Sequence, residues 1–300
     1  MHKFITVYTP TYNRGYCLGR LYESLINQTN KSFIWLIVDD GSTDETRKLV
    51  QKWILEGLLD IEYHYHENKG KMESLNFAHS IINTELCTCV DSDDYLTNDA
   101  IDFIKNAWDN IYDKNEIAGI VGLDSYSNGE IIGTSFPKDL NKSRFSDFEY
   151  KYHIKGDKKF VYRTAVIKEF PPYPNINGEK FPAPSYLYRL IDQKYYLMLY
   201  NKVLCIAEYL PDGLSQNKFL QYKKSAHSFL FYRKEVIRLS KFFIERFKNC
   251  MHYVSLCIFL KRNPYCKDLN PFLITISLPF GIILFLYLMR TKRKGLVGNK

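Results

Sequence analysis

The chain contains 300 residues, of which 46% are hydrophobic and 25% are charged. These are ordinary globular values, so they exclude wholesale disorder, and a chain of this length buries enough surface to fold without a disulfide or metal staple. Lys and Arg number 41 against 33 Asp and Glu, which gives a net charge of +8, and the excess is concentrated in residues 218–300. A localised positive segment attracts anionic lipid or nucleic acid and says nothing about the fold.

Strand-like and helix-like patterns alternate over the first 125 residues. Continuous apolar runs, such as Phe33 to Val38, have the length of a strand that is covered on both faces. Apolar residues such as Leu18, Leu21 and Leu25 recur at the spacing of one helix face. The patterns predict strands over residues 4–9, 33–38, 61–66 and 86–90, each followed by a helix. Repeated units of this kind indicate an α/β fold with a doubly wound, mainly parallel sheet.

A polar cluster follows each of the four predicted strands. These clusters are residues 12–13, 39–40, 68–71 and 91–94. Ligands of doubly wound sheets bind beyond the carboxyl ends of the strands, so we expect the four clusters to converge on one site. Beyond residue 125 the pattern weakens, and long loops around an acceptor are predicted over residues 125–215.

The run Asp91-Ser-Asp93-Asp94 suits a metal and diphosphate site. Crowded carboxylates repel one another unless a cation or hydrogen-bond donors neutralise them. Mg²⁺ and Mn²⁺ take oxygen ligands from one or two carboxylates and complete their shells with phosphate oxygens and water. The alternative is an acidic turn that caps the next helix through Asp94 or Thr97.

The run from Asp39 to Glu45 contains a capping-box pattern, which predicts Ser42 as the cap of the following helix. Asp40 can in addition accept hydrogen bonds from a base or ribose edge. Lys71 and Asn76 lie after the third predicted strand, and their side chains could reach phosphates. The alternative for Lys71 is an ordinary solvated lysine.

Together, these segments closely resemble family 2 glycosyltransferases with the GT-A fold, over roughly residues 3–125. The resemblance is carried, in this order, by Thr9-Pro-Thr-Tyr-Asn-Arg14, Val38-Asp-Asp-Gly-Ser-Thr-Asp44, Glu67-Asn-Lys-Gly-Lys71 and Val90-Asp-Ser-Asp-Asp94. It implies a Rossmann-like nucleotide-binding core. Residues 156–158, 178–181 and 207–215 are similar to stretches of bacterial family members that assemble polysaccharides such as capsules.

The resemblance also implies a set of donor contacts. Pro10, Tyr12 and Asp40 fall where family members hold the nucleobase, usually uracil. Asp91 and Asp93 fall on the family's D-x-D motif, with Asp93 favoured as the direct ligand of Mn²⁺ or Mg²⁺ and Asp91 near the ribose or the metal. The remaining contacts with the nucleotide-sugar are expected at Arg14, Lys71, Asn76 and Ser92.

Members of this family are inverting: an acceptor hydroxyl attacks the anomeric carbon, the nucleoside diphosphate leaves from the opposite face, and a carboxylate takes the acceptor proton. Many relatives carry this acid shortly before an aromatic residue and an Arg. Here Ala183 or Pro184 stands at that position. Glu179 is the nearest replacement as general base, with Asp157 and Asp192 behind it, and the alternative for Glu179 is a capping or ion-pairing role.

Residues 271–289 are almost entirely apolar and are followed by the basic run 290–294. At about 1.5 Å per residue, such a helix matches a hydrocarbon core of about 30 Å. The basic run favours an anionic, cytoplasmic leaflet. A spanning helix, an interfacial helix and a helix that covers a core groove are the three alternatives. Pro279 and Gly281 weaken a straight span, so we favour in-plane or re-entrant membrane attachment through residues 265–300.

We therefore expect a catalytic domain over residues 1–220, with a donor half (1–125) and an acceptor half (126–220), and a helical, basic C-terminal region over 221–300. We expect neither a signal peptide nor disulfides, as in a reduced, cytosolic protein.

The sequence predicts a metal-dependent, inverting glycosyltransferase at the cytoplasmic face of a bacterial membrane. It would move a sugar from a UDP donor to a polysaccharide or lipid-linked glycan. Two alternatives stay open. A nucleotidyltransferase is disfavoured because Thr9 to Arg14 lacks a Gly-rich loop. A catalytically degenerate nucleotide-sugar-binding or scaffold protein is motivated by the missing acid near Ala183. A nucleic-acid partner is disfavoured because the positive residues flank an apolar run.

Overall fold

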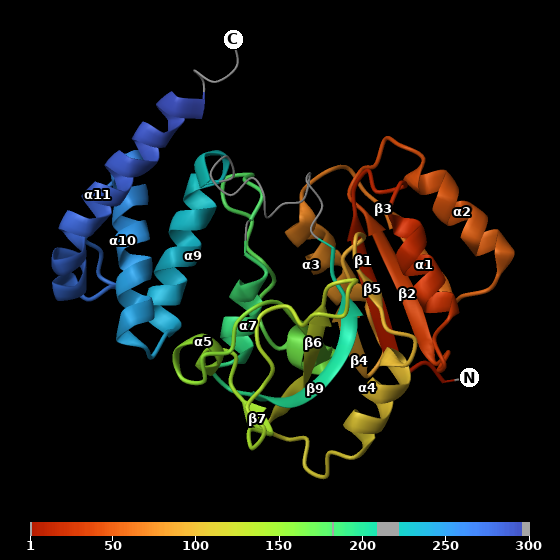
Figure 1. Ribbon diagram of the computed structural model, residues 1–300. Helices are drawn as coiled ribbons and strands as arrows, with labels where there is room; N and C mark the ends of the chain where they lie inside the picture. The colour runs from red at the N-terminus through yellow and green to blue at the C-terminus, as the bar shows by residue number, and fades with distance from the viewer. Residues whose placement is uncertain (1, 182, 209–221, 296–300) are drawn as a thin grey trace. The chain divides into compact units, whose positions relative to one another are not determined.

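The computed structural model (Figure 1) describes residues 2–181, 183–208 and 222–295, with side chains up to residue 290. The chain forms two compact units. We call residues 1–173 together with 190–216 the sheet unit, and residues 174–189 together with 217–300 the helical unit. Among the segments that the sequence singled out, residues 209–215 of the last family-like stretch lie outside the described part.

One mixed sheet forms the centre of the sheet unit. In the described residues its strands run in the spatial order β3-β2-β1-β4-β8-β6-β9-β5, with β7 paired to β9. β1 is parallel to β2 and β4, and β2 is parallel to β3, whereas β8 is antiparallel to both β4 and β6. The strands are β1 (Ile5–Thr11), β2 (Phe33–Asp39), β3 (Ile61–Tyr65), β4 (Leu86–Cys89), β5 (Tyr95–Leu96), β6 (Ile117–Ser125), β7 (Lys142–Ser143), β8 (Lys158–Arg163) and β9 (Tyr196–Ile206).

Helices follow the parallel strands, as the sequence predicts. They are α1 (Leu18–Ile26), α2 (Thr46–Glu56), α3 (Lys71–Ile81) and α4 (Ala100–Asp109), with the short α5 (Asp147–Tyr150) and α6 (Thr164–Lys168) further along. Apolar side chains of β1, β2 and β4 pack with α1, α2 and α4 in one core. Within it the ring of Trp53 stacks on Tyr22, with centroids 4.2 Å apart, and lies against Trp35. The predicted α/β fold is confirmed, and this core fixes the strands whose ends carry the polar clusters.

Residues 125–215 contain more regular structure than predicted. β8 inserts between β4 and β6, and β9 is a strand of 11 residues. The register of β9 against β6 shifts at several points, so its residues do not alternate cleanly between two faces. A strand without strict alternation gives a weak sequence signal. The prediction of long loops was therefore wrong for β8 and β9.

The predicted capping box does not form. α2 begins at Thr46, and Ser42 lies in the preceding loop, where its Oγ accepts a hydrogen bond from the Asn13 N–H at 2.9 Å. Asp44 instead accepts bonds from the N–H and the hydroxyl of Thr46, at 3.0 and 2.5 Å. The prediction of Ser42 as a helix cap was wrong because its hydroxyl joins the loops that follow β1 and β2.

The helical unit is built around a second apolar core. Its helices are α9 (Ala226–Leu239), α10 (Phe243–Phe259) and α11 (Pro271–Gly295), and most of α7 (Ser185–Ile191) belongs to it. The helical character predicted for residues 221–300 is confirmed by α9, α10 and α11. At Gly281, α11 runs so close to α10 that a Cβ would lie 2.5 Å from a methyl carbon of Val254. Within this unit a buried ion pair joins Arg189 to Glu245 at 2.6 Å.

Candidate functional site

The loops after β1 and β2 hold each other at the carboxyl edge of the sheet. Asn13 adopts a left-handed backbone conformation (φ 52°), and its Oδ1 accepts a hydrogen bond from the Thr43 N–H at 2.8 Å. Pro10 is buried in β1 opposite Val38. Tyr12, two residues later, is 46% exposed. The turn therefore presents an aromatic ring to solvent at the edge where the sequence places the nucleobase.

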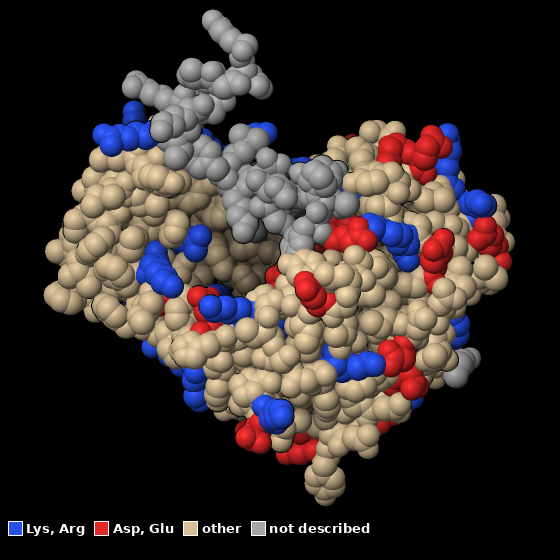
Figure 2. All heavy atoms as spheres, in the orientation of Figure 1, with Lys and Arg blue, Asp and Glu red and all other residues tan. Residues whose placement is uncertain are grey.

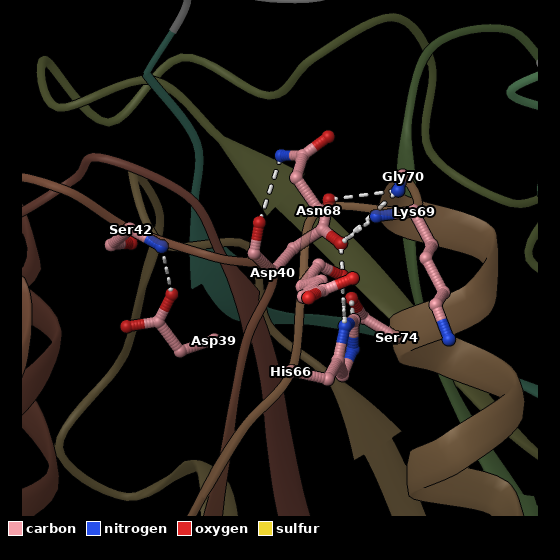
Figure 3. Close-up of polar contacts among 9 residues, drawn as sticks. Asp39, Asp40, Ser42, His66, Asn68, Lys69, Gly70 and Ser74 are labelled. Atoms are coloured by element: carbon pink, nitrogen blue, oxygen red, sulfur yellow. Dashed lines mark hydrogen bonds and ion pairs between the residues drawn. The ribbon is translucent and has the colours of Figure 1, made fainter.

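Asp40 anchors the loop that follows β3 (Figure 3). Its carboxylate accepts hydrogen bonds from the N–H groups of Lys69 and Gly70, at 2.7 and 2.9 Å. The Asn68 side chain donates to the Asp40 carbonyl at 2.8 Å, and the His66 ring lies 3.6 Å from the carboxylate. Asp40 itself is only 5% exposed. Its carboxylate thus fixes residues 66–70, a structural role that the sequence did not reveal.

The anchored loop leads directly into α3, whose first residue reaches the acidic motif. Gly70 precedes α3 with φ 97°, a conformation that favours glycine, and Lys71 begins the helix. Lys71 Nζ donates to Asp91 Oδ2 at 2.6 Å. Burial would raise the pKa of Asp91, but the charges of Lys71 and Lys159 outweigh it and hold the pKa below its usual value. The structure therefore brings together two predicted site residues, and Lys71 is not simply a solvated lysine.

The other two acids of the motif have the opposite electrostatic character. Burial and the charge of Asp91 raise the pKa of Asp93 above its usual value. Burial raises the pKa of Asp94 to about 7, against the opposing charge of Lys159. The helix-cap alternative for Asp94 is wrong, because α4 begins only after Asp99. A carboxylate with a raised pKa is one whose negative charge is under-compensated, so a cation placed beside it would be favourable.

The donor set of the motif fits a hard divalent cation. In the part of the chain that the structure describes, no group of three or more His, Cys, Asp or Glu side chains is arranged to hold a metal. Mg²⁺ and Mn²⁺ do not need such a cage, since they keep water and phosphate oxygens in their shells. Asp93 and Asp91 offer the one or two carboxylates that such an ion takes. The residues present therefore fit the predicted Mn²⁺ or Mg²⁺.

Two charged residues that the sequence reasoning missed complete the acidic edge. Asp124 lies near the end of β6, is 4% exposed, and burial raises its pKa to about 6 despite the nearby Lys159. Lys159, on β8, is buried and donates to the Cys89 carbonyl at 3.2 Å. Asp124 follows the apolar run of residues 117–123, as Asp39 follows the apolar run 33–38, so the same rule would have found it. A Lys near the start of a strand gives no such signal.

Three predicted donor contacts have partners within the sheet unit. Arg14 Nη1 donates to the Tyr16 hydroxyl at 2.7 Å. Ser92 is buried. The amide of Asn76 donates to the Tyr173 carbonyl at 2.9 Å and accepts from the Tyr173 N–H at 2.8 Å. Asn76 thus holds the segment that enters the helical unit, and its two polar atoms serve a backbone contact.

Glu179, the first candidate base, caps a helix of the helical unit. Its Oε2 accepts a hydrogen bond from the Ser228 N–H at 2.7 Å, and its Oε1 accepts from the His227 N–H at 3.2 Å and lies 2.8 Å from the His227 ring. Burial would raise the pKa of Glu179, but these hydrogen bonds outweigh it and lower the pKa. A carboxylate held this way at the N-terminus of α9 stabilises the helix. The contacts of Glu179 are therefore those of a helix cap, the alternative role that the sequence left open.

The other two candidate bases lie in the sheet unit and differ in exposure. Asp192 is 4% exposed, and burial raises its pKa while hydrogen bonds from Ser146 oppose the shift. Asp157 is exposed and immediately precedes β8. Its charge acts on Asp124, so it lies at the acidic edge of the sheet. Of the three candidate bases, Asp157 is the one that is both exposed and located at the acidic edge of the sheet.

Comparisons with known proteins agree with this architecture. A structure of S. aureus TarS 1–349 in complex with UDP-GlcNAc is 16% identical, with a TM-score of 0.59 over 98% of this chain and 92% of that one. A structure of the mannosyltransferase PcManGT from Pyrobaculum calidifontis, in complex with GDP-Man and Mn²⁺, is 15% identical. Its TM-score is 0.56 over 100% of this chain and 82% of that one. At these identities the likeness shows a shared GT-A fold.

This chain matches only a part of each of its sequence relatives. The teichoic acid poly(glycerol phosphate) polymerase of Staphylococcus epidermidis is 30% identical over 174 residues, which are 55% of this chain and 22% of that protein. The chain spans about a third or less of the length of the first curated relatives that it matches. Residues 6–170, more than half of the chain, match the family described as Glycosyl transferase family 2. The predicted family is thereby confirmed, and the chain belongs to glycosyl transferase family 2.

Proposed function

We propose that this chain is an inverting, metal-dependent glycosyltransferase that moves a sugar from a UDP-sugar to a hydroxyl of a polysaccharide or lipid-linked glycan. The observation that carries the proposal is the Lys71–Asp91 contact beside Asp93 at the carboxyl edge of the sheet. It lies within the residues that match the family. A cation and a carboxylate pair at this edge are the groups that a nucleoside diphosphate and its metal require. We assign the catalytic domain to residues 1–220 and membrane attachment to 221–300.

Each part of the donor has a group suited to it. Tyr12 presents a ring on which a base can stack, and Asp40 fixes the loop that would border the base. Lys71 places an ammonium beside the diphosphate. Asp93 and Asp91 would hold the metal, which supplies charge neutralisation at the leaving diphosphate when it is bound. The sugar's anomeric carbon would then face the acceptor side of the same edge.

The donor site is tested by calorimetric binding of UDP with Mn²⁺ and again with chelator. We expect Mn²⁺-dependent binding, and a loss of at least about tenfold in UDP affinity in Asp93→Ala, because a direct ligand of the metal is removed. Asp109→Ala is the matched control, since Asp109 is an exposed acid on α4 paired with Lys105. Equal UDP affinity in Asp93→Ala and in the control would refute the assignment of the metal ligand.

The loop anchored by Asp40 gives a second prediction. Asp40→Ala leaves the N–H groups of Lys69 and Gly70 without their acceptor, so we expect lower thermal stability and weaker UDP binding. The loss of the charged hydrogen bonds corresponds to about 2–3 kcal/mol of unfolding free energy. Glu67→Ala, in the same loop but exposed, should change neither quantity. Unchanged melting and UDP affinity in Asp40→Ala would show that the loop does not need this anchor.

We propose Asp157 as the general base. It is the exposed candidate at the acidic edge, whereas Glu179 caps α9 and Asp192 is buried. Asp157→Asn should lower kcat by about 10²–10⁴-fold, the usual contribution of a base, while UDP affinity is retained. Glu179→Gln should chiefly lower the melting temperature, because it weakens a helix cap. Turnover of both variants is measured by UDP release from a panel of UDP-sugars, and their melting temperatures by thermal unfolding. The reverse pattern, with turnover lost only in Glu179→Gln, would return the role to Glu179.

The helical unit carries the features that we assign to a membrane surface. Residues Pro271–Arg290 of α11 are long and apolar enough to cross a bilayer, with a mean hydropathy of 2.4 and 22% of the stretch buried. On the face drawn in Figure 2 the surface over α10 and α11 is mostly uncharged. The exposed large apolar residues of α10 and α11 are Phe243, Ile244, Phe272, Phe280, Ile282, Ile283, Leu286, Tyr287 and Met289. The name of one relative, a teichoic acid poly(glycerol phosphate) polymerase, supports a polymeric acceptor. We assign the protein to the cytoplasmic face of the membrane.

Flotation with anionic vesicles tests the membrane assignment. The double variant Phe272→Glu with Ile283→Glu places charges at two exposed positions of α11 without touching its buried contacts. We expect at least about a tenfold fall in the vesicle partition coefficient, because each charge is costly in hydrocarbon. Leu55→Glu, at an 88% exposed position on α2, is the control and should bind as the wild type does. Equal binding of all three proteins would contradict attachment through α11.

A further inference from the structure

The first turn of α1 lies against the turn of the acidic motif. Arg20 Nη2 donates a hydrogen bond to the Asp93 carbonyl at 3.4 Å. The thiol of Cys17, the residue that immediately precedes α1, donates to the Ser92 carbonyl at 3.5 Å. Two consecutive carbonyls of the motif are therefore held by donors from the start of one helix. These contacts act on the backbone from which the carboxylate of Asp93 projects.

Arg20 also joins the motif to the end of β9. Its Nη1 forms an ion pair with the carboxylate of Glu208, which lies two residues beyond β9. The N–H of Glu208 in turn donates to Asp94 Oδ1 at 3.2 Å. Because Asp93 and Asp94 are neighbours in the chain, the contacts form a closed ring through Arg20 and Glu208. All four residues lie in the sheet unit.

Strand pairing places the end of β9 beside the motif. β5 follows the motif directly and is antiparallel to β9, with Tyr95 opposite Ile206. The pairing starts at Tyr95, so the preceding turn lies outside it. The ring through Arg20 and Glu208 extends the connection between the two segments to Asp93, the residue that we assign as the metal ligand.

We propose that Arg20 is a positioning residue for the metal site, which fixes the direction of the Asp93 side chain by holding the Asp93 carbonyl and is itself held by Glu208. The inference rests on the proposed function, because that function makes Asp93 the metal ligand. Groups that orient a metal ligand typically change metal affinity by about 10–100-fold. The ion pair is partly exposed, at 38% and 29% of the two side chains, so its loss should affect stability little. The expected effect is therefore on cation binding and not on folding.

The charge of Arg20 distinguishes positioning from simple electrostatics. A cationic side chain beside a metal site repels the metal, so removing its charge would by itself strengthen Mn²⁺ binding. Loss of a positioning contact would instead weaken Mn²⁺ binding. The guanidinium is also a planar fork that meets two acceptors at once, whereas a lysine has one nitrogen. Arg20→Lys therefore keeps the charge and loses the fork, and Arg20→Met loses both.

The test measures UDP binding by calorimetry at increasing Mn²⁺ for the wild type, Arg20→Met and Arg20→Lys. We expect Arg20→Met to need at least about tenfold more Mn²⁺ for half-maximal binding, with Arg20→Lys between it and the wild type. Lys202→Met is the matched control, because Lys202 lies on β9 and forms a partly exposed ion pair with Asp99 at 2.5 Å. This control should keep the wild-type Mn²⁺ dependence. An unchanged or lower Mn²⁺ requirement in Arg20→Met would overturn the proposal.

A double variant tests whether Glu208 acts through Arg20. Glu208→Gln removes the ion pair but keeps the backbone N–H that donates to Asp94. If Glu208 only holds Arg20, the double variant Arg20→Met with Glu208→Gln should need no more Mn²⁺ than Arg20→Met alone. Additive shifts would show that Glu208 acts by its own charge, and they would overturn the part of the proposal that concerns Glu208.

Melting with Mn²⁺ and no nucleotide separates this proposal from the proposed function. In chelator the wild type and Arg20→Met should melt at similar temperatures, whereas Mn²⁺ should stabilise Arg20→Met less than the wild type. Absent UDP binding in the wild type, with this difference in the Mn²⁺ response retained, would refute the donor site alone. An equal response to Mn²⁺ in both proteins would refute the positioning role. If Arg20→Met does not fold, the comparison of Arg20→Lys with the wild type decides the question in the same way.

Discussion

The carboxylate of Asp40 is the contact on which the rest of the candidate site depends. By accepting the N–H groups of Lys69 and Gly70, it fixes the point at which α3 begins. Lys71, the next residue, can then reach Asp91 at 2.6 Å. A strand end, a loop, a helix start and the acidic motif are thus linked through one buried side chain. Because buried carboxylates are costly unless they are hydrogen-bonded, this chain of contacts has little freedom to rearrange.

The same edge of the sheet gathers more negative charge than its neighbours neutralise. Asp91 is compensated by Lys71 and Lys159, whereas the pKa values of Asp93, Asp94 and Asp124 are all raised. The folded protein is therefore expected to bind a cation favourably at this edge. A divalent cation would add positive charge among these acids, and the bound cation would in turn attract the negative charge of a diphosphate. The electrostatics of this edge therefore suit a divalent cation together with a diphosphate.

The sequence was sufficient to predict which residues meet at the ends of the parallel strands. It was not sufficient to predict the site residues that later segments of the chain add. Asp39 and Asp91 directly follow apolar runs, and parallel strands bring such residues to one edge, so their convergence could be predicted. Asp124 follows the same rule, but the apolar run of residues 117–123 before it was not among the predicted strands. Lys159 could not be found, because only the antiparallel insertion of β8 carries it to that edge. For Ser42 a local pattern was misleading. The sequence predicts a helix cap, but the hydroxyl instead accepts a hydrogen bond from Asn13, in the loop that follows β1.

The missing acid at Ala183 and Pro184 is consistent with how residues 174–189 are used. Ala183 is buried, Glu179 closes the N-terminus of α9, and Arg189 pairs with Glu245 inside the helical unit. The polar groups of Glu179 and Arg189 are therefore used for a helix cap and an ion pair within that unit. A general base also needs an accessible carboxylate oxygen that can take the acceptor proton, and both oxygens of Glu179 already accept hydrogen bonds from the first turn of α9. The exposed acid at the start of β8, Asp157, has such access, and its charge acts on Asp124.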